Sequence, residues 1–194
     1  PEIRFKEEWT SNRIAAFLEE KMIPYDRGFA NGTGIVATLR GKTDRTVALR
    51  ADMDALPITE ETGLPYASVF PGCMHACGHD GHMAALCGAA AILAVMRDQL
   101  KANVKFIFQP GEESAGGARL MIRDGALDDV EAIFGLHGWP DLPLGVVGLR
   151  SGALMAGAQD FFVEIEGMGS HGATPHAGID PLVAAAHVVM ALQT

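Results

Sequence analysis

Helical patterns of apolar residues alternate along the chain with short, strand-like apolar runs. From residue 5 to residue 22 the spacing is close to helical, with apolar side chains at Trp9, Ile14, Phe17, Leu18 and Met22. Residues 82–100 also predict a helix, and its small side chains would allow close packing on a sheet. A third, short helix is predicted over residues 117–127.

Four short apolar runs predict the strands of a sheet. Residues 34–39 (GIVATL) and 46–49 (TVAL) are β-branched runs on either side of a polar turn, so we predict that they pair. Residues 104–108 (VKFIF) and 132–136 (AIFGL) predict buried strands. Because strands and helices alternate, we expect an α/β fold with a mainly parallel sheet covered by helices.

The pattern changes after Gly152. Residues 159–166 (QDFFVEIE) predict a strand and residues 181–194 a helix, with a glycine-rich loop between them. One strand and one helix cannot bury a core unaided. We therefore predict a first domain over residues 1–155 and the beginning of a second, incomplete domain over residues 156–194.

Both ends of the chain indicate a fragment of a longer protein. The segment Pro1-Glu2-Ile3 leads abruptly into a helical pattern without an initiator methionine. The last helical pattern stops without a Gly, Asn or basic residue to end it. We expect further sequence on both sides.

Composition and charge exclude several classes of partner. The 194 residues are 48% apolar and 20% charged, which is typical of a globular protein, and the net charge is −9. Without a cluster of Lys or Arg, we expect neither nucleic acid nor an acidic membrane as a partner. The charge-free stretch over residues 83–96 is too short to cross a bilayer. Three cysteines do not make a disulfide framework, so we expect a reducing, cytoplasmic location.

Candidate chemistry gathers where three predicted strands end. Polar residues directly follow the TVAL, VKFIF and AIFGL runs, at residues 50–54 (RADMD), 109–113 (QPGEE) and 137–140 (HGWP). Ligands of open α/β sheets bind beyond the carboxyl ends of the strands. The alternative is that each cluster is an ordinary polar loop, but a pair of glutamates at a buried edge usually needs a partner such as a metal.

Residues 72–82 (GCMHACGHDGH) hold three of the seven histidines and two of the three cysteines. Cys77 and His79 can point to the same side of an extended segment, and a thiolate with an imidazole suits a metal of borderline softness. A helix-capping loop or a pair of buried thiols would fit the stretch as well. Together with Glu113 and His137, the two residues make a mixed S, N and O set suited to Zn, Mn, Co or Ni.

The two adjacent glutamates, Glu112 and Glu113, can divide two tasks. Neighbouring carboxylates in an extended loop point in different directions, so one can bind a metal while the other takes a proton from water. Asp52 and Asp54 fit best as hydrogen-bond partners that orient ligand imidazoles, or else as capping carboxylates of a turn. We expect His82 to pack or cap rather than to bind a metal.

The remaining histidines and cysteines carry weaker expectations. His171 and His176 lie in a loop far from the candidate metal ligands, where a histidine of a mobile second domain could donate a hydrogen bond to an oxyanion. Cys73 and Cys87 are expected to be small buried hydrophobes. His187 is expected to be a core or surface histidine.

Five motifs occur in order: LRADMDALPI (49–58), GCMHACGHDGHMA (72–84), FQPGEE (108–113), GLHGWP (135–140) and GMGSHGATPH (167–176). They resemble the signature blocks of the aminoacylase, hippurate hydrolase and indole-acetyl-amino-acid hydrolase group. This group is a branch of the dinuclear metallopeptidases that includes bacterial carboxypeptidase G. The chain has Gly111 and Ser170 where the group often has alanine and glycine, neither of them a metal or proton position.

The resemblance implies a catalytic domain of the phosphorylase/hydrolase-like zinc-exopeptidase type, followed by a small ferredoxin-like α+β domain that serves as lid and dimer interface. It implies a general base at Glu112, a supporting role for Asp54, and a lid histidine at His171 that can reach the site of a partner subunit. It also implies two divalent metal ions, with a last ligand histidine beyond Thr194 and the ligands Cys77, His79, Glu113 and His137.

The resemblance thus implies a metal-dependent amidohydrolase, a homodimer that cleaves small N-acyl-amino acids. Three alternatives remain: a dipeptidase or carboxypeptidase of the same superfamily, a cysteine hydrolase that uses Cys77, and a catalytically silent binding or regulatory protein on the same scaffold. We expect little or no turnover from residues 1–194 alone.

Overall fold

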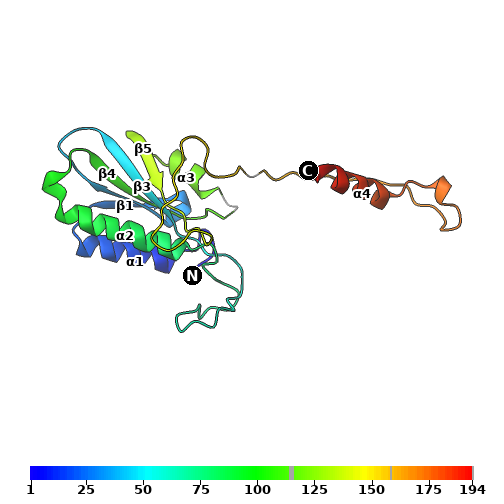
Figure 1. Cartoon of the computed structure of the whole chain (residues 1–194), viewed down its shortest axis with the longest axis horizontal. Coiled ribbons are helices and arrows are strands. Elements are labelled where there is room, and N and C mark those ends of the chain that lie inside the picture. Colours follow the sequence, from blue (N-terminus) through cyan, green and yellow to red (C-terminus); the bar gives the residue numbers. More distant parts are fainter. Residues whose placement is uncertain (114–115, 158, 194) are drawn as a thin grey trace. The chain divides into compact units, whose positions relative to one another are not determined.

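A computed structural model describes residues 1–113, 116–157 and 159–193 (Figure 1). The chain divides into two compact units, Pro1–Pro143 and Leu144–Thr194. This division lies before the domain boundary expected at residue 155. Among the described helices, none combines the length and the apolar character that a bilayer span requires.

The first unit is built on a five-stranded mixed sheet with the strand order β1-β2-β4-β3-β5. Strand β3 pairs in parallel with both β4 and β5, whereas β1–β2 and β2–β4 are antiparallel. The parallel strands predicted from the sequence therefore form one side of the sheet. The strands are β1 (Tyr25–Phe29), β2 (Gly34–Leu39), β3 (Thr46–Asp52), β4 (Asn103–Gln109) and β5 (Val130–Gly135).

The predicted pairing of β2 with β3 is wrong, because β4 lies between them. Strand β4 is buried at almost every position, and the middle of the sheet is the place that covers such a strand at both edges. Strand β1 was not predicted, since its sequence YDRGF is polar and mostly exposed. Such a sequence is typical of an edge strand.

Helices cover both faces of the sheet (Figure 1). Successive side chains of β4 alternate between the two cores: Phe106 and Phe108 pack with α1 and α2, whereas Ile107 packs with Met121 of α3. The α/β class with a helix-covered sheet is therefore confirmed. The helices are α1 (Glu8–Glu20), α2 (His79–Val95) and α3 (Gly117–Arg123).

Helix α2 begins three residues earlier than predicted, and this shift decides the site. Gly78 has φ +82°, a left-handed conformation that glycine adopts without cost, and the helix starts at the next residue. His79 and His82 thus lie three residues apart on one helical face. At its other end α2 stops at Val95, and a short 3₁₀ turn (Arg97–Gln99) follows.

The second unit contains helix α4 (Pro181–Leu192), whose first turn is capped by the Asp180 carboxylate accepting the Leu182 N–H at 2.9 Å. The helix was predicted to reach Thr194, which lies outside the described residues. The strand predicted over residues 159–166 is not formed. A strand requires a hydrogen-bonded neighbour, and no described residue pairs with this stretch.

The core should be sensitive to the loss of Phe106, whose side chain is fully buried. We expect Phe106→Ala to lower the free energy of unfolding by about 3–5 kcal/mol, because it removes apolar contacts and leaves a cavity. Tyr66→Ala, at an aromatic side chain that is 80% exposed, is the control and should change stability by less than about 0.5 kcal/mol. Equal effects in denaturant titrations would contradict this placement of the core.

Stability should also depend on pH through Glu7, a fully buried carboxyl directly before α1. Burial raises the pKa of Glu7, although it accepts hydrogen bonds from Thr33 and Gly111. Folding therefore favours the protonated form, so the stability that Glu7 contributes is present below its unfolded-state pKa and is lost as the pH rises through its folded-state pKa. We expect wild type to lose stability relative to Glu7→Gln as the pH rises from below 4.5 to neutrality, measured by denaturant unfolding. If the difference in unfolding free energy between wild type and Glu7→Gln is constant with pH, it would contradict the raised pKa of Glu7.

Candidate metal centre

The three polar clusters predicted at strand ends meet at one edge of the sheet. In the parallel register, Asp52 of β3 is the partner of Gln109 of β4, and Arg50 of β3 is the partner of Gly135 of β5. The carboxyl ends of the three neighbouring strands therefore lie side by side. The residues that follow them reach the same region as the start of α2.

His79 stands at the centre of this region and is 1% exposed. Its Nδ1 lies 2.8 Å from the main-chain carbonyl oxygen of Asp54, which can only accept, so Nδ1 carries the proton. Its Nε2 is buried and has no hydrogen-bond partner among the described residues. Three carboxylate oxygens lie 3.6–4.0 Å from this atom, those of Asp52, Glu112 and Glu113.

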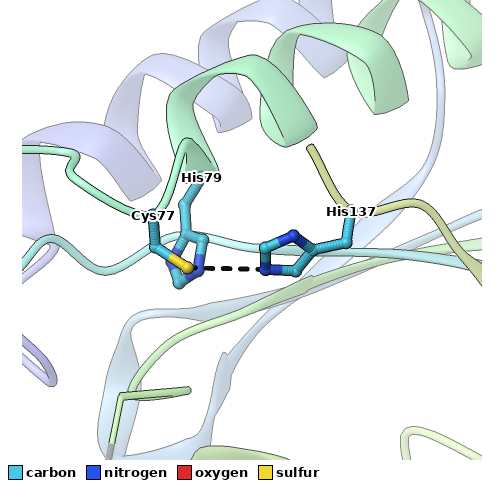
Figure 2. Close-up of side chains that lie close together, drawn as sticks. All are labelled: Cys77, His79 and His137. Atoms are coloured by element: carbon cyan, nitrogen blue, oxygen red, sulfur yellow. Dashed lines mark hydrogen bonds between the residues drawn. The ribbon is translucent and has the colours of Figure 1, made fainter. Parts of the chain in front are cut away.

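Cys77 and His137 also lie close to His79 (Figure 2). The Cys77 Sγ lies 3.4 Å from Nε2 of His137, and the potential ligand atoms of the three residues lie within 4.8 Å of one another. The potential ligand atoms of His79, Glu112 and Glu113 also lie within 4.8 Å of one another. These two groups share His79 and together contain a sulfur, two imidazoles and two carboxylates, and His79 forms a third such group with Asp52 and His82.

This donor set fits a divalent cation. A neutral His79 with its proton on Nδ1 presents an unshared electron pair at Nε2, and a buried polar atom without a partner is costly. The surrounding atoms are acceptors or a thiol, so a cation would compensate all of them at once. Sulfur together with imidazole favours a transition metal or zinc over calcium or magnesium.

Asp54 holds the loop that carries the two glutamates. Its buried carboxylate accepts hydrogen bonds from the main-chain N–H groups of Glu112 at 2.9 Å and of Glu113 at 3.0 Å. Burial alone would raise the pKa of Asp54, but its hydrogen bonds with His79 and with these two N–H groups lower it. Asp54 is therefore a charged residue, and its hydrogen bonds fix the main chain of both glutamates.

His82 is occupied on both ring nitrogens. Its Nδ1 lies 2.7 Å from Oδ1 of Asp52, and its Nε2 accepts the N–H of Gly138 at 2.8 Å. Arg50 pairs with the same aspartate at 2.7 Å, and the pKa of Asp52 is lowered although burial alone would raise it. His82 is therefore a buried packing residue, as expected, and its hydrogen bond fixes Gly138, the residue after His137.

The cysteine-hydrolase alternative has one observation in its favour, the contact of Cys77 with His137. However, burial and a hydrogen bond with the Glu113 carboxylate raise the pKa of the Cys77 thiol to about 11. A nucleophilic cysteine requires a lowered pKa. In this environment the thiol remains protonated at neutral pH unless a cation binds beside it.

The other singled-out residues are not members of these groups. His171 belongs to the second unit, where its Nδ1 accepts the N–H of Ala173 at 3.1 Å. Cys73 is buried, as predicted, whereas Cys87 is only half-buried and packs against the core. His187 is exposed on α4.

No sequence motif marks Glu7, which lies beside residues 110–113, here called the glutamate loop. Its carboxylate accepts the N–H of Gly111 at 3.1 Å, across 104 residues of sequence. Its sequence signal is weak, because a glutamate before a helical pattern is more often an exposed first-turn residue.

The chain is similar to proteins of known name along its whole length. It is 50% identical over 195 residues to an N-acetyl-L-cysteine deacetylase of Bacillus subtilis, covering 100% of this chain and 47% of that protein. It is 43% identical over 198 residues to an N-acyl-L-amino acid amidohydrolase of Geobacillus stearothermophilus, covering 100% of this chain and 52% of the relative. The chain thus spans about half the length of these relatives.

A solved structure agrees with these likenesses. The Bacillus subtilis YXEP protein, described as a dinuclear metal binding peptidase from the M20 family, superposes with a TM-score of 0.75 at 47% identity. The superposition covers 78% of this chain and 43% of the other. Residues 48–193 match the model of peptidase family M20/M25/M40. Because this match covers most of the chain, including every strand-end cluster of the site, the chain belongs to peptidase family M20/M25/M40.

Proposed function

We propose that the protein containing this chain is a metal-dependent amidohydrolase that cleaves the amide bond of N-acyl-amino acids. The observation that carries the proposal is the buried, unpartnered Nε2 of His79 among carboxylates, a thiol and a second imidazole. The names of two relatives, a deacetylase of an N-acetyl-amino acid and an N-acyl-amino acid amidohydrolase, support this substrate class.

In this proposal two divalent ions, of Zn, Mn, Co or Ni, are held by Cys77, His79, Glu113 and His137. When bound, such ions lower the pKa of water and polarise a carbonyl group. The hydrogen bond from Nδ1 of His79 to the Asp54 carbonyl directs the ring, so that Nε2 is the nitrogen that would bind an ion.

Glu112 is the proposed general base. Its side chain is 42% exposed, so it can meet both water and substrate, while its main-chain N–H is held by Asp54. It would take the proton of the attacking water and pass it to the nitrogen of the leaving amine. Asp54 acts through the other residues, by holding the main chain of Glu112 and the ring of His79.

His171 is the proposed lid histidine. Since its Nδ1 accepts the Ala173 N–H, its neutral ring carries the proton on Nε2. That N–H can donate to the oxyanion that develops on the substrate carbonyl. The family resemblance supports a homodimer formed through the second unit, in which this histidine serves a site of the partner subunit.

The proposed location is the cytoplasm, where a reducing environment keeps the Cys77 thiol free. The net charge of −9 supports a small-molecule substrate rather than nucleic acid or an acidic membrane as partner.

Replacement of Glu112, the proposed base, tests proton transfer separately from metal binding. We expect Glu112→Gln in the full-length protein to keep its metal content and to lower kcat about 100-fold or more, since the amide cannot take a proton. Metal content by mass spectrometry and hydrolysis of N-acetyl- and N-benzoyl-amino acids are the measurements. Glu61→Gln, at an exposed loop glutamate, is the control and should leave both unchanged. Full activity of Glu112→Gln would refute the assignment.

Metal removal distinguishes the proposal from the cysteine-hydrolase alternative. We expect a chelator to abolish hydrolysis and added Zn, Mn, Co or Ni to restore it, because the proposed water cannot be activated without the ion. Peptides and dipeptides in the same assay test for a carboxypeptidase or dipeptidase. Activity that survives chelation but is lost on alkylation of Cys77 would favour the alternative. A metal-loaded protein that hydrolyses none of these substrates would indicate a binding protein.

A further inference from the structure

We propose that residues 2–7, here called the N-terminal brace, position the two loops that carry Asp54 and Glu112, and that Glu7 is a positioning residue for Glu112. The role given to Glu112 rests on the function proposed above. The effect of the brace on the loop is a property of the fold and can be measured without catalysis.

Glu7 is a fully buried carboxylate whose two oxygens have different partners. Oε1 accepts the main-chain N–H of Gly111 at 3.1 Å, and Oε2 accepts the hydroxyl of Thr33 at 2.9 Å. Burying a carboxylate is costly, and an apolar residue would fill the space without that cost. The carboxylate adds the hydrogen bonds to Thr33 and Gly111, and the one to Gly111 reaches the glutamate loop.

Buried carboxylates accept three successive main-chain N–H groups of the glutamate loop. The N–H of Gly111 is bound by Glu7, and those of Glu112 and Glu113 are bound by the two oxygens of Asp54. Without Glu7, the N–H of Gly111 would lose its partner, and this part of the loop would keep the two bonds to Asp54 and the bond from the Gly117 N–H to the Gly111 oxygen. Rotation about Gly111 would then move the carboxylate that has to meet the substrate.

The brace also contacts Gly111 sterically. Gly111 has φ +61°, and a Cβ at this position would lie 2.8 Å from Cε1 and Cζ of the Phe5 ring. Phe5 itself has φ +59°, a left-handed conformation that is unfavourable for a non-glycine residue. A strained residue thus places its ring against Gly111, which has no side chain.

The other end of the brace is joined to the Asp54 loop. The N–H of Ala55 donates to the main-chain oxygen of Glu2 at 2.8 Å, and Ile3 forms a parallel bridge with Ala55. The Glu2 carboxylate in turn accepts the first N–H groups of α1, from Trp9 and Thr10. One short segment therefore connects helix α1 with both loops of the site.

Hydrogen exchange tests the brace without reference to activity. In the full-length protein, we expect Glu7→Leu to speed exchange of the amides of residues 111–113 by about 10-fold or more, while amides of α2 remain protected. Glu7→Gln keeps an oxygen for Gly111 and should exchange like wild type. Glu8→Gln, at the exposed neighbouring glutamate, is the matched control. If Glu7→Leu does not fold, Phe5→Ala provides a second test. It leaves Glu7 in place and should speed exchange of the same amides.

Kinetics then link the brace to the proposed base. We expect Glu7→Leu to lower kcat about 10-fold or more, with KM and metal content close to wild type, and Glu7→Gln to retain most of kcat. Unchanged exchange at residues 111–113 in both Glu7→Leu and Phe5→Ala, or faster exchange throughout β4 and α2, would overturn the proposal. Faster local exchange in a protein that hydrolyses no N-acyl-amino acid would support the brace and refute the proposed function.

Discussion

The arrangement of the site depends on the burial of Asp54. A carboxylate that is removed from water must have its oxygens hydrogen-bonded, and here the donors are the N–H groups of Glu112 and Glu113. The carbonyl oxygen of the same residue accepts a hydrogen bond from Nδ1 of His79. One residue at the end of β3 thereby sets the main chain after β4 and the ring at the start of α2. The hydrogen bonds of one buried residue thus place β3, the loop after β4 and the start of α2 relative to one another.

The same region has more buried acceptors than donors. Arg50 and His82 satisfy Asp52, and the loop N–H groups satisfy Asp54, but His79 Nε2 has carboxylate oxygens around it and no hydrogen-bond partner among the described residues. Such an arrangement is stable only when a positive charge is supplied. A rigid sheet edge suits this purpose, because donor atoms that are held in place lose little conformational entropy when they bind an ion. Residues 2–7 extend this rigidity to the loop of Glu112.

The sequence predicted most of the elements of the first unit, and its errors have physical causes. Apolar runs identify strands but not their neighbours, so the pairing of β2 with β3 was wrong once β4 lay between them. The edge strand β1 carries too little apolar periodicity to be recognised. The run over residues 159–166 has the character of a strand, but without a described partner it forms none. Pairing is a property of the whole sheet, whereas periodicity is a property of one segment.

The sequence alone determined which functional groups are available and that each cluster of them directly follows a strand-like run, because spacing along the chain is local information. Only the tertiary structure decided how each group is used. His79 and His82 are both imidazoles of α2, yet Nε2 of His82 accepts the N–H of Gly138, 56 residues away, while that of His79 has no hydrogen-bond partner in the described part of the chain. Glu7 likewise acquires its place from a contact across 104 residues. Hydrogen bonds between distant segments form only when the chain folds, so no local pattern could have assigned them.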